Sequence, residues 1–341
     1  MRRMTHILSV CLATMAFAAD AQTFQAAMTT LELTERDRTL SGFLWYPTED
    51  TGPTTLDFES KVWVGTSVVR DAEPARGPFP LVVLSHGIFG NAYNQAWLAS
   101  ALAQRGYAVA AIDHPGTSTW SQEPDLSRQL WERPKDISRV IDHALAAPAL
   151  TDLVDRDHIY MAGHSLGGFT AVALAGARFD ATQFQSFCDA TPGELVCRIL
   201  MSWRVAQTPE DQARMEADLS DSRIKAFAVF DLGGTQSFSE KSLATLNRPM
   251  LVFGAQVMNS GLTLDIESRA LVAAAPASIT QYIEPEDLSH FDFLGLCKPG
   301  GLELLAREEP GDEIICDNGG IARAAKHEMI INHVERFFRL E

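Results

Sequence analysis

The sequence is poor in basic residues: 28 Lys and Arg stand against 44 Asp and Glu in 341 residues, and the formal net charge is −16. An acidic surface of this kind repels phosphate groups, which disfavours nucleic acid and anionic lipid as partners. The sequence also lacks low-complexity linkers and internal repeats, and it is long enough to bury a large core. We therefore expect residues 22–341 to form a single domain.

No apolar run has the length that a membrane-spanning helix needs. The apolar run over residues 7–19 is well short of the roughly 20 residues required, although a membrane helix is the alternative interpretation. Arg2 and Arg3 precede this run, and small residues ending at Ala21 follow it, an order typical of a secretory signal peptide. We expect residues 1–21 to be removed and the protein to be periplasmic or secreted, with no stable membrane insertion.

Cysteine is scarce, with five residues in the chain, one of them inside the expected signal peptide. In an oxidising compartment, the four others are expected to pair locally as Cys188 with Cys197 and Cys297 with Cys316. Metal binding is the alternative, but neither pair has the CxxC spacing typical of zinc sites. We expect two disulfides, no metal site and no cofactor.

Short apolar runs alternate with helical patterns from Phe79 onward, which is typical of a mostly parallel sheet with helices on both faces. The expected strands are 79–87, 108–116, 158–165, 224–231, 249–255 and 278–285, and the expected helices are 91–107, 136–148, 166–177 and 321–338. Before them, 29–35 and 39–47 are expected to pair antiparallel at the sheet edge. Residues 180–222 are interpreted as a loop-rich insertion or small cap.

A glycine-flanked serine lies where an expected strand turns into a helix. In "GHSLG", Gly163 and Gly167 flank Ser165. Glycine lets the chain reverse without a side-chain clash, and the helix that follows directs its first amides toward developing negative charge. This context favours a nucleophile at Ser165 over a turn that serves packing alone.

A serine hydroxyl needs a base, and the base needs an orienting acid. His290 lies in the loop after the last expected strand, where a chain ordered serine, acid, histidine carries its base. Asp231 ends the strand after the insertion, and a strand end holds a carboxylate rigidly, so we expect Asp231 to be the acid. Asp265, after the next strand, is the alternative, and Asp292 is interpreted as a turn residue.

Two backbone amides are expected to stabilise an oxyanion, those of Ile88 and Leu166. Leu166 directly follows the serine, and Ile88 lies in "HGIFG", where Gly87 and Gly90 let the backbone approach a substrate. The alternative is that "HGIFG" is an ordinary connection between a strand and a helix.

Six segments carry a resemblance to a known family: "LSHGIFGN", "LAQRGYAVAAIDHPG", "RPKDISRVIDHAL", "AGHSLGGFTAVALAG", "FDLGG" and "LSHFDFLGLC". In this order, over about residues 40–300, they resemble the α/β-hydrolase superfamily. More narrowly, they resemble bacterial predicted dienelactone hydrolases, which are related to plasma-type platelet-activating-factor acetylhydrolases. The resemblance implies the same nucleophile, base, acid and oxyanion amides. True dienelactone hydrolases carry a cysteine nucleophile, whereas this chain has Ser165, so the family name does not indicate a substrate.

The sequence thus predicts an α/β-hydrolase fold and an exported serine carboxylester hydrolase, with a small-molecule or lipid ester as substrate. A phospholipid acylhydrolase, a hydrolase of polyester fragments or amides, and a hydrolase fold that binds without catalysis remain as alternatives. Neither the acyl-chain length of the substrate nor the oligomeric state follows from the sequence.

Overall fold

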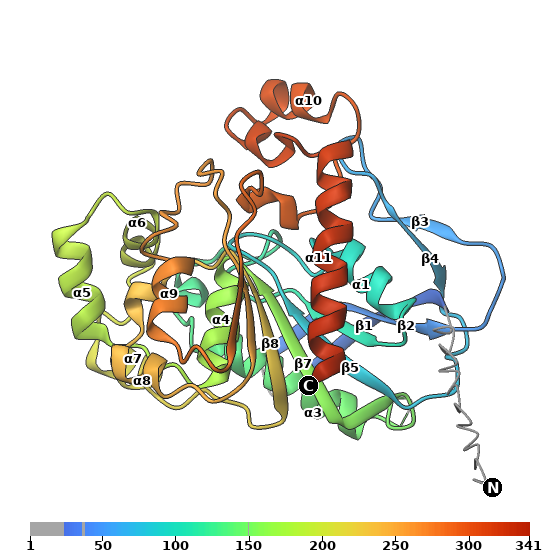
Figure 1. Ribbon diagram of the computed structural model, residues 1–341, viewed down its shortest axis with the longest axis horizontal. Helices are drawn as coiled ribbons and strands as arrows, with labels where there is room; N and C mark the ends of the chain where they lie inside the picture. Colours follow the sequence, from blue (N-terminus) through green and yellow to red (C-terminus); the bar gives the residue numbers. More distant parts are fainter. Residues whose placement is uncertain (1–23, 36–37, 149) are drawn as a thin grey trace, which may run out of the picture.

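The computed structural model describes residues 24–341 except 36, 37 and 149, so the expected signal peptide lies outside the described residues. One ten-stranded sheet has the order β10-β9-β8-β7-β5-β6-β2-β1-β4-β3 (Figure 1). Its strands are β1 (Gln25–Glu35), β2 (Arg38–Thr48), β3 (Thr55–Asp57), β4 (Thr66–Arg70), β5 (Phe79–Ser85), β6 (Ala108–Ile112), β7 (Val154–His164), β8 (Ile224–Phe230), β9 (Met250–Phe253) and β10 (Thr280–Ile283).

The six strands from β5 to β10 pair in parallel, which confirms the mostly parallel sheet expected from the sequence. The apolar run of β8 is almost wholly buried, because helices cover both of its faces. The carboxyl ends of β7, β8 and β9 lie next to one another in this order. Side chains placed just after these strands therefore meet at one edge of the sheet.

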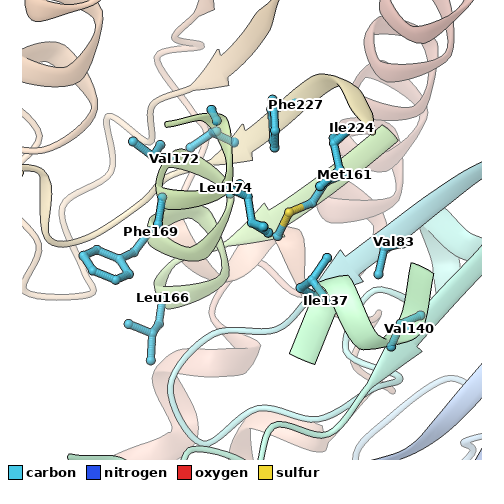
Figure 2. Packing of buried hydrophobic residues seen from close by; sticks show 14 of the residues in the cluster. Val83, Ile137, Val140, Met161, Leu166, Phe169, Val172, Leu174, Ile224 and Phe227 are labelled. Atoms are coloured by element: carbon cyan, nitrogen blue, oxygen red, sulfur yellow. The ribbon is translucent and has the colours of Figure 1, made fainter. Parts of the chain in front are cut away.

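The helices divide between the two faces of the sheet. Helices α1 (Ala96–Ala103) and α11 (Ile321–Leu340) pack on one face, and α3 (Glu132–Ala146), α4 (Leu166–Ala175), α8 (Glu240–Ala244) and α9 (Ser268–Ala274) pack on the other. Figure 2 shows the hydrophobic core between the sheet and this second group of helices, in which Ile137, Phe169 and Met161 come from α3, α4 and β7. The α/β-hydrolase architecture expected from the sequence is thus confirmed.

Helix α1 is shorter than expected and begins at Ala96 rather than Asn91. The preceding residues form a turn in which the Asn94 side chain accepts a hydrogen bond from the Asn91 amide, at 2.7 Å. A helix that began at Asn91 would leave this amide without an intrahelical acceptor, and in the turn the Asn94 side chain accepts from it instead. Residues of this turn, among them Asn91 and Asn94, line the cavity beside the candidate site.

The N-terminal strands pair antiparallel as expected, but they are not the edge of the sheet. The short strand β4 adds in parallel to β1, and β3 adds antiparallel to β4, beyond the pair. Strands of three and five residues are too short to leave a clear alternating pattern, so the sequence alone did not indicate them.

The description of residues 180–222 as loop-rich is wrong, because the segment folds into three helices: α5 (Ala181–Ala190), α6 (Leu195–Ser202) and α7 (Pro209–Met215). Two of them carry ordinary start signals. The Asp180 side chain accepts from the Gln183 amide, and the Thr208 side chain accepts from the Asp211 amide with proline next in the chain.

Both expected cysteine pairs are bonded. Cys188–Cys197 joins α5 to α6, and Cys297–Cys316 closes an excursion that contains α10 (Gly301–Glu308). The remaining helix is α2 (Pro124–Ser127). Within the part of the chain that the structure describes, none of the helices combines the length and apolar character needed to cross a bilayer.

Candidate active site

Ser165 occupies a strained turn between β7 and α4. Its backbone has φ 56° and ψ −117°, a left-handed conformation that residues other than glycine rarely adopt. A Cβ atom at Gly163 would lie 2.0 Å from the Gly167 carbonyl oxygen, and one at Gly167 would lie 1.9 Å from the Ser85 carbonyl oxygen. Both glycines are therefore required for the turn that presents Ser165.

His290 and Asp231 form a buried pair. The Nδ1 atom of His290 lies 2.6 Å from Oδ2 of Asp231, and both side chains are less than a tenth exposed. The other carboxylate oxygen accepts from the Ala255 amide at 2.9 Å, in the connection after β9. With both oxygens occupied, Asp231 can hold the imidazole in one orientation with Nε2 free.

Ser165 and His290 line the same cavity at the carboxyl ends of the strands. The Ser165 hydroxyl makes no hydrogen bond to any of the described residues. Hydrogen bonds between a nucleophile and its base are often long without substrate and tighten in the reacting complex. The structure thus brings together the three side chains that the sequence singled out, and their catalytic roles stay predictions.

Two unpaired amides face this region. Neither Ile88 N–H nor Leu166 N–H donates to an acceptor among the described residues. The Gly87 carbonyl accepts from His86 Nδ1 at 2.7 Å and from the Gly90 amide at 3.2 Å. Because N–H and C=O point in opposite directions across a trans peptide, these two bonds turn Ile88 N–H away from His86.

His86 is held as one neutral tautomer. Its Nε2 atom accepts from the His114 amide at 3.1 Å, so the ring proton must be on Nδ1, where it donates to Gly87. Burial, with the charge of Arg133 as a second cause, lowers the pKa of His86 well below its ordinary value. The sequence did not indicate this role of His86, because the role depends on contacts of its ring with backbone groups.

Asp292 is more than the turn residue expected from the sequence. It caps the short helical turn that starts with His290, accepting from the Ser289 amide at 2.8 Å. The same buried carboxylate meets Lys326 Nζ at 2.7 Å and Arg323 Nε at 3.3 Å, both from α11. Two cations of the closing helix therefore anchor the loop that carries His290.

His327, one position further along α11, completes this anchorage. Its Nε2 atom donates to the carbonyls of Asp292 and Leu294, and its ring stacks on Trp97 with centroids 3.7 Å apart. Burial lowers the pKa of His327 to about 3, so the ring stays neutral. The long-range pairing of α11 with the His290 loop was not visible in the sequence.

Asp265, the alternative acid, and the nearby Glu284 are both engaged with Arg269. Asp265 is exposed and pairs with Arg269 at 2.7 Å. Glu284 also accepts a hydrogen bond from Arg269. This bond is the main reason why the pKa of Glu284 falls to about 2. Among the described residues, His290 has a carboxylate partner only in Asp231.

Glu267 stabilises the chain that follows Asp231. One carboxylate oxygen accepts from the amides of Gly234 and Thr235, each at 2.8 Å. Complete burial and, to a smaller extent, the charge of Asp231 raise the pKa of Glu267 to about 8, against the opposing effect of these hydrogen bonds. At neutral pH the side chain is therefore mostly protonated.

We predict that Glu267→Gln changes the pH dependence of stability. A folded-state pKa above the unfolded value means that the native protein binds the proton more tightly, so stability falls as pH rises from about 4.5 to about 8. The slope is up to about 1.4 kcal/mol per pH unit, and glutamine, which mimics the neutral acid, should remove it. Urea unfolding of both proteins at pH 5 and pH 8 measures the difference.

A matched control for this prediction is Glu284→Gln, which removes a carboxylate whose pKa is lowered rather than raised. Its loss should not make the protein more stable at pH 8. If the free energy of unfolding changed with pH equally in the wild type and in Glu267→Gln, the assignment of the pH dependence to Glu267 would be contradicted.

A second serine, histidine and aspartate lie in contact below the site. Ser85 Oγ is 3.0 Å from His114 Nε2, and His114 Nδ1 is 3.1 Å from Asp136 Oδ2. All three side chains are fully buried, and Arg133 also donates to Ser85 and to the His86 carbonyl. This set supports the loop that begins at His86 and offers no reactive atom to the cavity.

Comparisons with known proteins agree with the fold. Residues 80–186 match the family model described as alpha/beta hydrolase fold. A solved ferulic acid esterase from Streptomyces cinnamoneus superposes with a TM-score of 0.60 at 23% identity, covering 94% of this chain and 90% of that chain. The protein therefore has the α/β-hydrolase fold.

Three curated relatives match shorter segments. Cutinase est2 of Thermobifida alba is 31% identical over 101 residues, which is 29% of this chain and 31% of that protein. The sn-1-specific diacylglycerol lipase ABHD11 of Mus musculus is 28% identical, over 41% of this chain and 45% of that protein. A bis(hydroxyethyl) terephthalate hydrolase of Streptomyces coelicolor is 26% identical over 42% of each. The matches thus span less than half of each relative.

Proposed function

We propose that this protein is an exported serine hydrolase of carboxylic esters in which Ser165 is the nucleophile, His290 the base and Asp231 the orienting acid. The observation that supports it most is the buried 2.6 Å contact between His290 and Asp231 beside the cavity that Ser165 also lines. A buried carboxylate on Nδ1 leaves Nε2 to take the serine proton. The three cited relatives have the names of a cutinase, a lipase and an ester hydrolase.

In the proposed reaction, His290 removes the Ser165 proton as the hydroxyl attacks the ester carbonyl carbon. The carbonyl oxygen becomes an oxyanion that accepts hydrogen bonds from the amides of Ile88 and Leu166. As the intermediate collapses, His290 Nε2 returns the proton to the leaving alcohol, and an acyl group stays on Ser165. Water then repeats the attack and releases the acid, while Asp231 stabilises the imidazolium in both halves.

Export is part of this proposal. The two disulfides are of the kind that persists in oxidising compartments, and the N-terminal sequence has the order of a signal peptide. A phospholipid acylhydrolase and a polyester-fragment hydrolase use the same chemistry on other esters. A binding protein without catalysis would not need a reactive serine.

A fluorophosphonate probe separates the enzyme from the binding protein. We expect stoichiometric labelling of the purified protein, with the modified peptide mapping to Ser165. Ser85→Ala is the matched control, because Ser85 is buried in the other Ser–His–Asp set and its loss should leave labelling at Ser165. A folded protein that resists labelling and hydrolyses none of a chain-length series of nitrophenyl esters contradicts the proposal.

The amide of Ile88 gives a further prediction through His86. Asparagine at position 86 can reproduce the donor at Nδ1, whereas glutamine can reproduce only the acceptor at Nε2. We expect His86→Gln to lower kcat by about 10²-fold, as for loss of one oxyanion donor, and His86→Asn to lose less. Steady-state kinetics with one nitrophenyl ester measures the two variants, and melting temperatures show whether both remain folded. Equal losses of kcat in both would contradict a role for the Nδ1 donor.

A further inference from the structure

The cavity beside Ser165 has a volume of about 490 Å³ and two separate walls. We call the first the α6 wall, which consists of Leu195, Val196, Ile199 and Leu200. We call the second the α10 wall, which consists of Trp63, Val64, Leu305 and Ile315. Figure 1 shows α6 and α10 well apart from each other. Each wall includes residues from a segment that a disulfide closes: Leu195 and Val196 lie between Cys188 and Cys197, and Leu305 and Ile315 lie between Cys297 and Cys316.

The α6 wall lies next to the loop that contains Ile88 and next to the chain that follows Asp231. Trp203, at the end of α6, has its ring centroid 5.8 Å from that of Phe89, the residue after Ile88. A Cβ atom added at Gly233 would lie 3.2 Å from Cγ2 of Val196. Helix α6 is therefore in contact with Phe89 through Trp203 and lies next to Gly233 through Val196 of the α6 wall.

The α10 wall is continuous with the loop of His290. Phe291 and Leu294, which follow His290, line the cavity, and the excursion with α10 begins directly afterwards. Two backbone hydrogen bonds join this excursion to the N-terminal segment: Val64 N to Leu296 O at 2.8 Å, and Lys298 N to Val62 O at 2.7 Å.

Arg323 of α11 ties the α10 wall to the anchorage of His290. Its guanidinium donates to the Ile315 carbonyl at 2.6 Å and to the Gly295 carbonyl at 2.8 Å, and it also meets Asp292. The α10 wall and the imidazole are therefore held by the same helix and keep a fixed relation to each other.

Proton transfer decides which group of the ester each wall meets. His290 Nε2 must reach the leaving oxygen, so the alcohol group lies on the His290 side and the acyl group extends away from it. We propose that the α10 wall binds the alcohol group of the ester and the α6 wall binds the acyl group. This assignment rests on the proposed ester hydrolysis.

The chemistry of the walls defines the substrate class. Both are made of aliphatic and aromatic side chains, and no Lys or Arg occurs among the described residues that line the cavity. The charged side chains Glu309 and Asp312 belong to the α10 excursion. A carboxylate or phosphate on either group would find no cationic partner, so the substrate is an ester whose acyl group is apolar and whose alcohol group carries no negative charge.

Two isoleucine substitutions form a matched test, since Ile199 and Ile315 are both half-buried cavity residues, one on each wall. Ile199→Ala should change the kcat/KM ratio of octanoate to acetate nitrophenyl esters about tenfold, and should leave the ratio of benzyl to methyl butyrate unchanged. Ile315→Ala should do the reverse. Ile199→Val and Ile315→Val should shift the same ratios less. They replace the alanine variants in the test if an alanine variant fails to fold.

A kinetic measurement distinguishes the walls independently. After the alcohol leaves, all esters of one acid give the same acyl-enzyme, so the rate at which that intermediate is hydrolysed does not depend on which alcohol has left. Ile199→Ala should alter the deacylation rate after a burst of nitrophenol, whereas Ile315→Ala should keep it within about twofold of the wild type. Reversed or equal effects in an active enzyme overturn the assignment of the walls alone. A wild type that neither hydrolyses esters nor reacts with fluorophosphonate overturns the proposed function as well.

Discussion

Ser165→Ala is expected to lower kcat for ester hydrolysis by about 10⁴-fold to 10⁶-fold, as loss of a triad nucleophile does, with little change in the free energy of unfolding. The substitution removes one hydroxyl that has no hydrogen-bond partner among the described residues. It leaves the strained turn and its two glycines in place. Turnover of a nitrophenyl ester and the midpoint of urea unfolding measure the two quantities.

Ser85→Ala is the control for this result as well. Its hydroxyl is buried and in contact with His114 and Arg133, so its loss should reduce stability. Turnover should fall far less than in Ser165→Ala. A folded Ser165→Ala protein with wild-type turnover would contradict the serine mechanism.

Asp231→Asn should lower kcat by about 10⁴-fold. The two oxygens of Asp231 accept from His290 Nδ1 and from the Ala255 amide. An asparagine has one acceptor oxygen, so if Ala255 keeps that oxygen, the amide NH₂ faces Nδ1 and favours the tautomer with its proton on Nε2. That tautomer cannot accept the serine proton. Steady-state kinetics at a pH above the ordinary pKa of histidine measures the loss of kcat.

Asp265→Asn is the matched control for the acid. Asp265 is exposed and paired with Arg269, so this variant should turn over esters within about twofold of the wild type, like most surface substitutions. An active Asp231→Asn together with an impaired Asp265→Asn would assign the acid to the later residue. If both variants were fully active, a carboxylate would not be the third member of the site.

The fold could be predicted because its central strands are short apolar runs separated by helical patterns. The position of Ser165 followed from two glycines whose absent side chains would meet backbone within about 2 Å. Asp231 and His290 followed from their places after strands. Each of these inferences depends on residues close together in the chain or on the order of elements.

Other features depend on contacts between distant segments, which a single sequence does not reveal. The anchorage of Asp292 by α11 joins residues more than 30 positions apart. The α10 wall joins Val64 to Leu296. The helices of 180–222 were missed for a different reason. Their capping residues are present in the sequence, but the short turns between the helices obscure the helical periodicity.

The buried set of Ser85, His114 and Asp136 has consequences for recognising enzymes by geometry. Its atoms follow the bonding order of a catalytic triad, and Ser85 is hydrogen-bonded to its histidine, whereas Ser165 makes no hydrogen bond to His290. A template search that scores interatomic distances alone would therefore report two triads in this chain and would rank the sealed one first. Such searches need steric access for a reactant as a separate criterion, because all three members of that set are 0% exposed.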